Sequence, residues 1–222
     1  MKRKIVLLVL LILPLTVYVY FSMVKHNSLF LPVITEGVNE VPSSATPDNG
    51  AVHLTDKISI VGFLGNDVMK KKESIFNLNQ KINNKYKEFQ DFQIVMLVPD
   101  GKQEEVKKLT TDISVMADIS NWNFVYTTPE NISQFYSSLK VKKPLDADYG
   151  SYDVFIIDKK RNLRGRNGMS KEGGKDKDYI EGYNTFSAAE LHNEMTDDVK
   201  ILLREYRLAL KKNEDKGIKR EI

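Results

Sequence analysis

The side chains that most often carry out chemistry in proteins are sparse in this chain of 222 residues. It contains no cysteine, so thiol nucleophiles, disulfides and soft copper ligands are all missing. The three histidines, His26, His53 and His192, share no ligand spacing such as i, i+4. A histidine-based metal site needs three or four convergent ligands. The histidines therefore give no reason to expect a metal centre.

Acidic residues are the remaining candidates. Asp146, Asp148 and Asp153 could converge on a hard cation such as calcium, although such clusters are more often solvated loops. Asp67 and Asp153 are the available general acid or base. No Gly-x-Ser-x-Gly turn or glycine-rich phosphate loop accompanies them. We therefore expect no catalytic residue, no metal and no cofactor. A cysteine-independent enzyme and a non-cysteine metal carrier remain open as alternatives.

The charge of the chain is nearly balanced. There are 33 basic and 30 acidic residues, which leaves a net charge of +3. This balance argues against nucleic acid as a partner. Hydrophobic residues make up 41% of the chain, which is enough for one good core.

The N-terminus has the pattern of a membrane anchor. Lys2, Arg3 and Lys4 precede an uncharged run over residues 5–24. As a helix, this run would be about 30 Å long, the thickness of a hydrocarbon core. The basic flank predicts a cytoplasmic N-terminus. We expect residues 1–24 to form a signal anchor with one transmembrane helix, and the soluble domain to lie on the exported, periplasmic side of the cell membrane.

A cleavable signal peptide is the alternative reading of the same segment. Pro14 would kink a spanning helix and could instead end the apolar region of a signal peptide. No Ala-x-Ala cleavage site lies near Ser22, however. Residues 25–56 then lose periodicity and are rich in proline and serine, which predicts a spacer. Within it, residues 33–34 or 52–54 could add a short edge strand.

From residue 57 onward, strand and helix patterns alternate. Apolar runs predict strands over residues 57–64, 92–98, 122–126, 152–157 and 163–166, the last two as a hairpin. Apolar spacing and capping signals predict helices over residues 69–89, 103–109, 129–139 and 187–210. The lysines at 70–72 are expected to be the solvated start of the first helix.

The rest of this region has less regular patterns. Residues 167–185 are rich in glycine and charge and predict a mobile surface loop, and residues 213–222 predict a charged tail. The order of elements predicts an α/β domain over residues 57–212, with a thioredoxin-like mixed sheet flanked by helices.

Three stretches resemble the Sco/SenC family of membrane-anchored, thioredoxin-fold copper proteins that help assemble cytochrome oxidase. Residues 60–69 stand where that family has an aromatic strand end followed by Cys-Pro-Asp-Val-Cys. Residues 121–125 are similar to its Asn-Trp-x-Phe strand, and residues 152–165 to its strand and hairpin ending in Arg-Gly. The resemblance covers most of residues 57–211. It implies a thioredoxin-like fold and a partner in a membrane complex.

The sequence departs from the family at the positions that carry its chemistry. Depending on the alignment, Gly65 and Met69, or Asn66 and Lys70, stand at the two cysteine positions. Residues 149–151, Tyr-Gly-Ser, stand where the family has its copper-binding histidine. We therefore do not expect copper binding or thiol redox activity.

The resemblance still implies an inherited groove at this position. It would be lined by Asn66, Asp67, Met69, Gly150 and Ser151. The resulting hypothesis is a membrane-anchored, exported protein that lacks redox cysteines and acts as a binding or assembly factor for a membrane complex.

Overall fold

The computed structural model describes residues 12–14, 16, 30–42, 52–115, 118–167 and 179–215. Most of the expected signal anchor lies outside these residues, as do residues 216–222 of the expected charged tail. Within the described ranges, no helix is both long enough and apolar enough to cross a bilayer.

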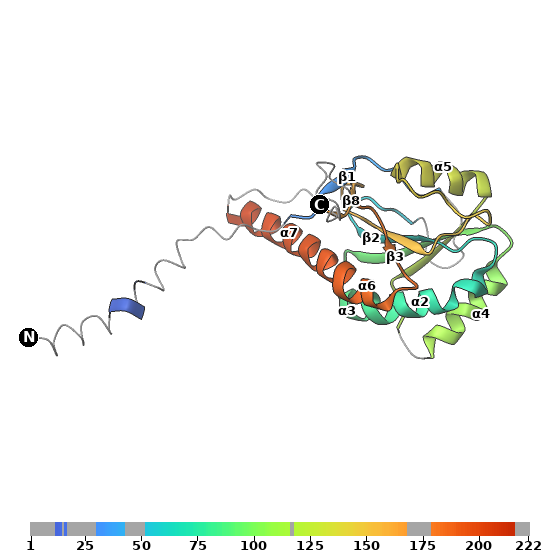
Figure 1. The fold of residues 1–222 in the computed structure, drawn as a ribbon, viewed down its shortest axis with the longest axis horizontal. Helices are drawn as coiled ribbons and strands as arrows, with labels where there is room; N and C mark the ends of the chain where they lie inside the picture. The colour runs from blue at the N-terminus through green and yellow to red at the C-terminus, as the bar shows by residue number, and fades with distance from the viewer. Residues whose placement is uncertain are drawn as a thin grey trace, which may run out of the picture.

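A mixed sheet forms the centre of the domain (Figure 1). Its main path follows the order β1-β6-β5-β2-β3-β4. The bounds of these strands are Val33–Thr35 for β1, Ile58–Phe63 for β2, Phe92–Pro99 for β3, Trp122–Thr127 for β4, Asp153–Ile157 for β5 and Leu163–Arg164 for β6. Strands β2, β3 and β4 are parallel, while β5 is antiparallel to β2 and to β6. The expected strands and the β5–β6 hairpin are therefore confirmed.

Helical segments connect and cover the strands. Those before β5 are η1 (Val68–Lys71), α2 (Lys72–Leu78), η2 (Asn79–Asn83), α3 (Asn84–Tyr86), α4 (Gln103–Ser114) and α5 (Pro129–Leu139). Those near the C-terminus are α6 (Ala188–Glu190), η3 (Leu191–Met195) and α7 (Thr196–Asp215). The predicted caps form: the side chains of Thr128 and Ser187 accept hydrogen bonds from the amides of Asn131 and Glu190.

Two apolar clusters fill the two faces of the sheet, because successive strand residues point to opposite sides. Ile58 and Ile60 of β2 face a cluster that also contains residues of α2, α4 and α7. Val61 and Phe63 face a second cluster that includes residues of α5. Figure 1 shows α5 on one side of the sheet and α2, α3 and α4 on the other.

The helix expected over residues 69–89 is one helical stretch with irregular turns. It begins as the 3₁₀ turn η1, continues as α2, widens into the π-helical η2 and ends with α3 at Tyr86. Asn79 and Asn83 are buried in the π turn, where Asn83 Nδ2 donates to Asn79 Oδ1 (2.8 Å) and to the Asp118 carbonyl oxygen (2.9 Å). Phe89 lies beyond the helix and is exposed, so its assignment to the helix was wrong.

Part of the expected spacer packs on the domain. Strand β1 pairs antiparallel with β6, which confirms the expected edge strand at residues 33–34. Val38, Val41 and Leu54 are buried in the cluster beneath α5. The described parts of the segment 25–56 therefore differ from flexible coil, because their apolar side chains complete the core.

The C-terminal part of the expected mobile loop is also ordered. Strand β8 (Tyr179–Ile180) pairs with β7 (Arg166–Asn167), and β9 (Tyr183–Asn184) pairs with β5. Tyr183 is fully buried, and its hydroxyl bonds to Asp198 of α7. The expectation of a mobile loop over residues 179–185 was therefore wrong, because a buried tyrosine fixes this segment to α7. Residues 168–178 lie outside the described residues.

Candidate functional site

The predicted groove residues lie where β2 ends. The chain leaving β2 forms a bridge between Leu64 and Gly150. The Ser151 amide donates to the Phe63 carbonyl oxygen (3.0 Å), and the Asn66 amide donates to the Asp148 carbonyl oxygen (2.9 Å). The backbone thus brings Asn66 together with Gly150 and Ser151, although Asn66 and Gly150 lie 84 positions apart in the sequence.

The two remaining groove candidates have structural roles. Asp67 is exposed and caps η1, because its Oδ1 accepts a hydrogen bond from the Lys70 amide (3.2 Å). Met69 is half-buried and packs against the apolar cluster under α2 and α4. The other proposed acid, Asp153, pairs with Lys143 (Oδ2 to Nζ, 2.8 Å). Among the hydrogen bonds and ion pairs of the described residues, neither aspartate is joined to a histidine or a second carboxylate that would tune it for acid–base catalysis.

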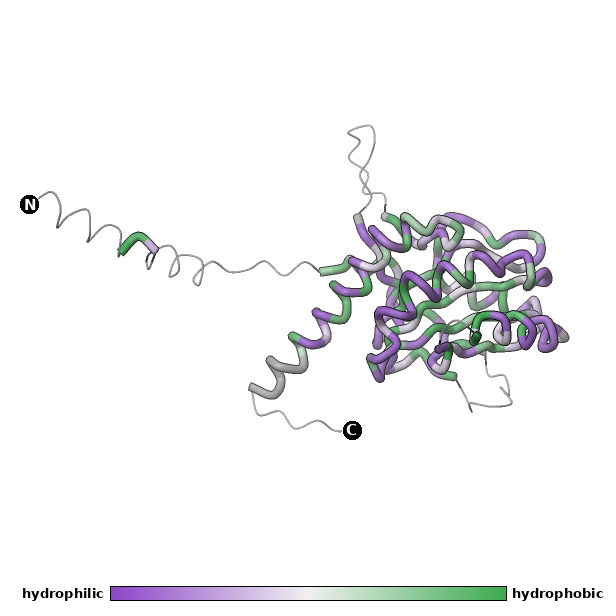
Figure 2. Tube along the Cα trace, turned by 90° about the horizontal axis from the view of Figure 1, so that it is seen from below, coloured by the Kyte–Doolittle hydropathy of each residue, from purple (hydrophilic) through white to green (hydrophobic). Residues whose placement is uncertain are grey.

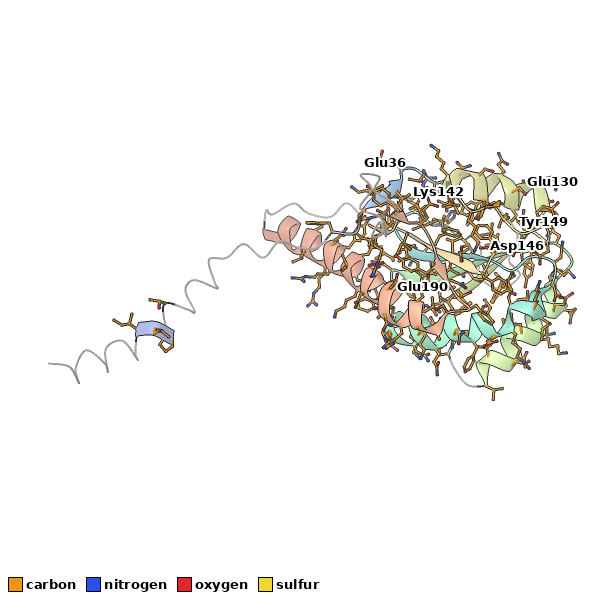
Figure 3. All side chains as sticks on the ribbon, in the orientation of Figure 1. Glu36, Glu130, Lys142, Asp146, Tyr149 and Glu190 are labelled. Atoms are coloured by element: carbon orange, nitrogen blue, oxygen red, sulfur yellow. The ribbon has the colours of Figure 1, made fainter. Side chains whose placement is uncertain are left out.

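The loop before β5 is a tight turn held by backbone hydrogen bonds. The Asp146 amide donates to the Gly150 carbonyl oxygen (2.9 Å), and the Tyr149 amide donates to the Asp146 carbonyl oxygen (3.0 Å). Tyr149 has a left-handed backbone, with φ of 63°. Figure 3 shows Asp146 and Tyr149 at the same end of the domain as Glu130 in the first turn of α5.

A buried lysine fills the space beneath this loop. The Lys71 side chain is only 3% exposed, and its Nζ lies 3.9 Å from Asp146 Oδ2 and 4.0 Å from the centre of the Tyr152 ring. A Cβ atom placed on Gly150 would come within 2.7 Å of Lys71 Cε and 3.0 Å of its Nζ. The expectation that all three lysines at 70–72 are solvated was therefore wrong for Lys71, whose side chain is buried beneath Gly150.

The surroundings of Lys71 act on its charge in opposite directions. Burial lowers the pKa of Lys71, and it outweighs the attraction of Asp148 and Asp146, which raises it. The ammonium is also placed for a cation–π contact with Tyr152. The cation next to Asp146 and Asp148 is thus the Lys71 ammonium group, which belongs to the protein itself. Among the described residues, no three histidine, aspartate or glutamate side chains are placed to hold a metal ion.

Two aromatic residues that the sequence analysis did not assign to the site continue this arrangement to the surface. The Tyr152 ring, which covers Lys71, meets the Phe186 ring edge to face with centroids 6.2 Å apart. Phe186 is 60% exposed. The Thr185 amide and hydroxyl both donate to the Tyr152 carbonyl oxygen (2.8 and 2.6 Å), which fixes the turn. A large exposed apolar side chain whose ring packs against a neighbouring aromatic ring is typical of a contact residue.

Replacing Lys71 with Met is expected to stabilise the fold by about 1–2 kcal/mol at neutral pH. Methionine keeps most of the volume and removes the cost of burying an ammonium group. Asp146, whose side chain is 51% exposed, stays solvated after the change. Urea denaturation measures the effect. Lys70→Met is the matched control, because Lys70 is the exposed neighbour and its loss is expected to be nearly neutral. A Lys71→Met protein that is clearly less stable than wild type contradicts this prediction.

The stabilisation of the Lys71→Met variant is expected to depend on pH. Since the pKa of Lys71 is lowered, the unfolded chain binds more protons than the folded one between that lowered pKa and 10.5. The unfolding free energy of the wild type therefore rises with pH in this window, relative to Lys71→Met. The advantage of the variant should shrink as the pH approaches 10.5.

No family model and no curated protein matches the sequence. Among solved structures, a thiol:disulfide interchange protein of the thioredoxin family from Chlorobium tepidum TLS matches with 18% identity and a TM-score of 0.51, over 78% of this chain and 99% of that chain. This likeness shows a thioredoxin-like fold and corresponds to the α/β fold expected from the order of elements.

Sco family structures are also among the matches. A Sco/SenC family lipoprotein from Bacillus anthracis str. Ames matches with 18% identity and a TM-score of 0.45, over 83% of this chain and 98% of that chain. BsSco, a member of the Sco family of cytochrome c oxidase assembly proteins, matches with 12% identity and a TM-score of 0.48, over 78% of this chain and 94% of that chain.

Proposed function

We propose that this chain is a membrane-anchored, exported thioredoxin-like protein that binds a protein component of a membrane complex without thiol or copper chemistry. The observation that carries the proposal is the position of Lys71. Its ammonium lies beneath Gly150, in the groove where the resemblance to the Sco/SenC family places redox and copper ligands. Because the Lys71 side chain occupies this position, we infer that the exposed residues around it bind the partner.

The surface around the groove has the properties of a protein contact. Phe186 presents an exposed ring whose position is fixed by Tyr152, and such rigid aromatic side chains often contribute most of the binding energy at interfaces. Asn66 and Asp67 are exposed in the turn after β2 and add polar groups with backbone positions fixed by hydrogen bonds. We infer that the partner presents an apolar pocket for Phe186, with hydrogen-bond donors around it.

The place of action is inferred from the sequence. The basic N-terminus followed by the apolar run over residues 5–24 favours a single-pass anchor with the domain on the exported side. The three stretches that resemble the Sco/SenC family favour a role in assembling a membrane complex such as an oxidase. Because the chain contains no cysteine, this proposal assigns it a binding role without thiol redox chemistry.

Photocrosslinking in native membranes tests the proposal. The full chain is expressed with p-benzoylphenylalanine in place of Phe186, and in a control in place of Val33, an exposed residue on the edge strand β1. We expect one discrete protein adduct at position 186, with a yield about ten-fold above that at position 33. Equal adducts at both positions, or none at 186, would overturn the proposed binding surface. The anchor is tested separately, by resistance of the chain to alkaline extraction from the same membranes.

A further inference from the structure

A second surface feature lies at the other end of the sheet from the candidate site. It is a groove of about 720 Å³ that includes Ile58, where β2 begins, and is bordered by α7. The candidate site begins after Phe63, where β2 ends. A strand of this length separates the two sites by about 20 Å. The groove is therefore independent of Lys71 and of the loop before β5.

The groove combines an apolar floor with basic edges. Its apolar lining includes Tyr86, Phe89, Leu203, Tyr206 and Leu208, and its basic lining consists of Lys159, Lys200, Arg204 and Arg207. On α7, positions 200, 203, 204, 207 and 208 share one helical face, so basic and leucine side chains alternate along it. Figure 2 shows this alternation of hydrophobic and hydrophilic residues where α7 projects from the body of the domain.

The basic side chains on α7 are available for a ligand. Lys159 is paired with Asp91. By contrast, among the side chains that the structure describes, no carboxylate forms an ion pair with Lys200, Arg204 or Arg207. Three cations on one helical face beside exposed apolar side chains are complementary to an anionic amphiphile. Amphipathic helices of this composition lie at the surface of membranes that contain anionic lipids.

The N-terminal segment places this face close to the expected bilayer. The Leu31 amide donates to Glu205 Oε1 of α7 (2.5 Å), and the Leu31 carbonyl oxygen accepts from Arg164 Nε (2.9 Å). The expected anchor ends at residue 24, and the seven Cα–Cα steps from there to Leu31 can span at most about 25 Å. Where the anchor spans a bilayer, the middle of α7 must therefore lie within about that distance of the membrane surface.

We propose that the groove along α7 rests on the membrane surface and binds the headgroup and upper acyl chain of an anionic phospholipid. This inference rests on the proposed membrane anchoring. Lys200, Arg204 and Arg207 neutralise the phosphate groups, while Phe89 and Leu208 enter the apolar boundary below the headgroups. The candidate site at the far end of β2 then points away from the lipid, toward the partner that it binds.

The absence of native cysteine makes a direct test possible, because a single introduced cysteine carries a label at one position only. The full chain with Leu208→Cys is spin-labelled and reconstituted into vesicles of phosphatidylcholine with phosphatidylglycerol, or of phosphatidylcholine alone. Val115→Cys, on an 80% exposed residue at the end of α4, is the control. Collision rates with oxygen and with a water-soluble nickel complex report the depth of each label.

We expect the label at position 208 to be shielded from the nickel complex in the anionic vesicles only, and the label at position 115 to stay accessible in both. Each basic residue near an anionic surface contributes about a five-fold preference, so Lys200→Glu, Arg204→Glu and Arg207→Glu together should lower the ratio of shielded to accessible label about 100-fold or more. Equal nickel access at position 208 in both vesicle types overturns the inference and favours a protein ligand. A chain that fails to float with either vesicle type overturns the anchoring itself.

Discussion

Replacing Arg164 with Met is expected to lower the free energy of unfolding by about 3–5 kcal/mol. Arg164 Nη1 donates to Asp158 Oδ2 (2.8 Å), and Nη2 donates to Glu205 Oε2 (2.5 Å). Nε and Nη2 both donate to the Leu31 carbonyl oxygen (2.9 and 2.5 Å). Burial alone would lower the pKa of Arg164, but the hydrogen bonds to both carboxylates outweigh it and leave the pKa raised. Without Arg164, two largely buried carboxylates lose their counter-charge.

Urea denaturation of the purified full chain measures this effect. Lys72→Met is the control, because it removes one partner of the exposed Lys72–Asp112 ion pair (2.5 Å), and such pairs contribute about 0–1 kcal/mol. Arg164→Lys keeps the charge but loses the planar donor group, and should fall between Arg164→Met and wild type. Equal losses in Arg164→Met and Lys72→Met would show that the buried network adds no more than a surface pair.

Replacing Gly65 with Ala is expected to cost about 2–4 kcal/mol of unfolding free energy. Gly65 has a φ of 71°, in the left-handed region that side chains rarely adopt. A Cβ atom there would also lie 2.8 Å from the Asp148 carbonyl oxygen and 2.9 Å from the Gly150 backbone nitrogen. The costs of backbone strain and of the collision are both expected to apply, because backbone hydrogen bonds hold the loop before β5 against Gly65.

The Gly37→Ala variant separates the cost of backbone strain from the cost of the collision. Gly37 also has a left-handed backbone, with φ of 63°, but nothing lies within 4 Å of the position of its missing Cβ. This variant should lose only about 1 kcal/mol, from backbone strain alone. Chemical denaturation of both proteins gives the comparison. Equal losses would mean that the loop before β5 moves aside at no cost, and that the collision adds nothing to the backbone strain.

The fold was largely predictable because its strands and helices have clear periodicity. Continuous apolar runs identified β2, β3 and β5, and the Thr128 cap identified the start of α5. The packing of residues 179–185 was not predictable, because glycine and charge in the neighbouring sequence masked the buried side chain of Tyr183. Its hydroxyl bonds to Asp198, a partner 15 residues further along the chain.

The position of the candidate site was predictable from the sequence, but two of the residues that form it, Lys71 and Phe186, were not. The resemblance located Asn66 and Gly150, which the structure brings together. The role of Lys71 was missed, because three consecutive lysines suggest a solvated helix start. Its helical phase carried the signal: Val68, Lys71 and Ile75 lie on one face, and all three are buried. Phe186 had no signal of its own, because only the folded chain places it against Tyr152.

The two ends of the domain have different chemistry. The end that holds Lys71 presents a fixed aromatic residue and exposed polar groups, which suits a protein partner. The end beside α7 presents cations around an apolar groove, which suits an anionic lipid surface. Arg164 joins the N-terminal segment to α7 at this second end. In the proposed membrane arrangement, a rigid connection there would hold the domain in one orientation, with the surface around Phe186 directed away from the bilayer.

The pH titration of the Lys71 side chain is the most direct test of the proposal, because the proposal depends on a lysine buried beneath the loop before β5. Isotope-labelled lysine side chains of the full chain are followed by NMR, and the Lys71→Met variant assigns the resonance. We predict that the pKa of Lys71 lies below its ordinary value of 10.5 and that the ammonium exchanges its protons slowly with water. A Lys71 resonance that titrates at or above 10.5 and exchanges its protons rapidly would contradict the burial of this side chain.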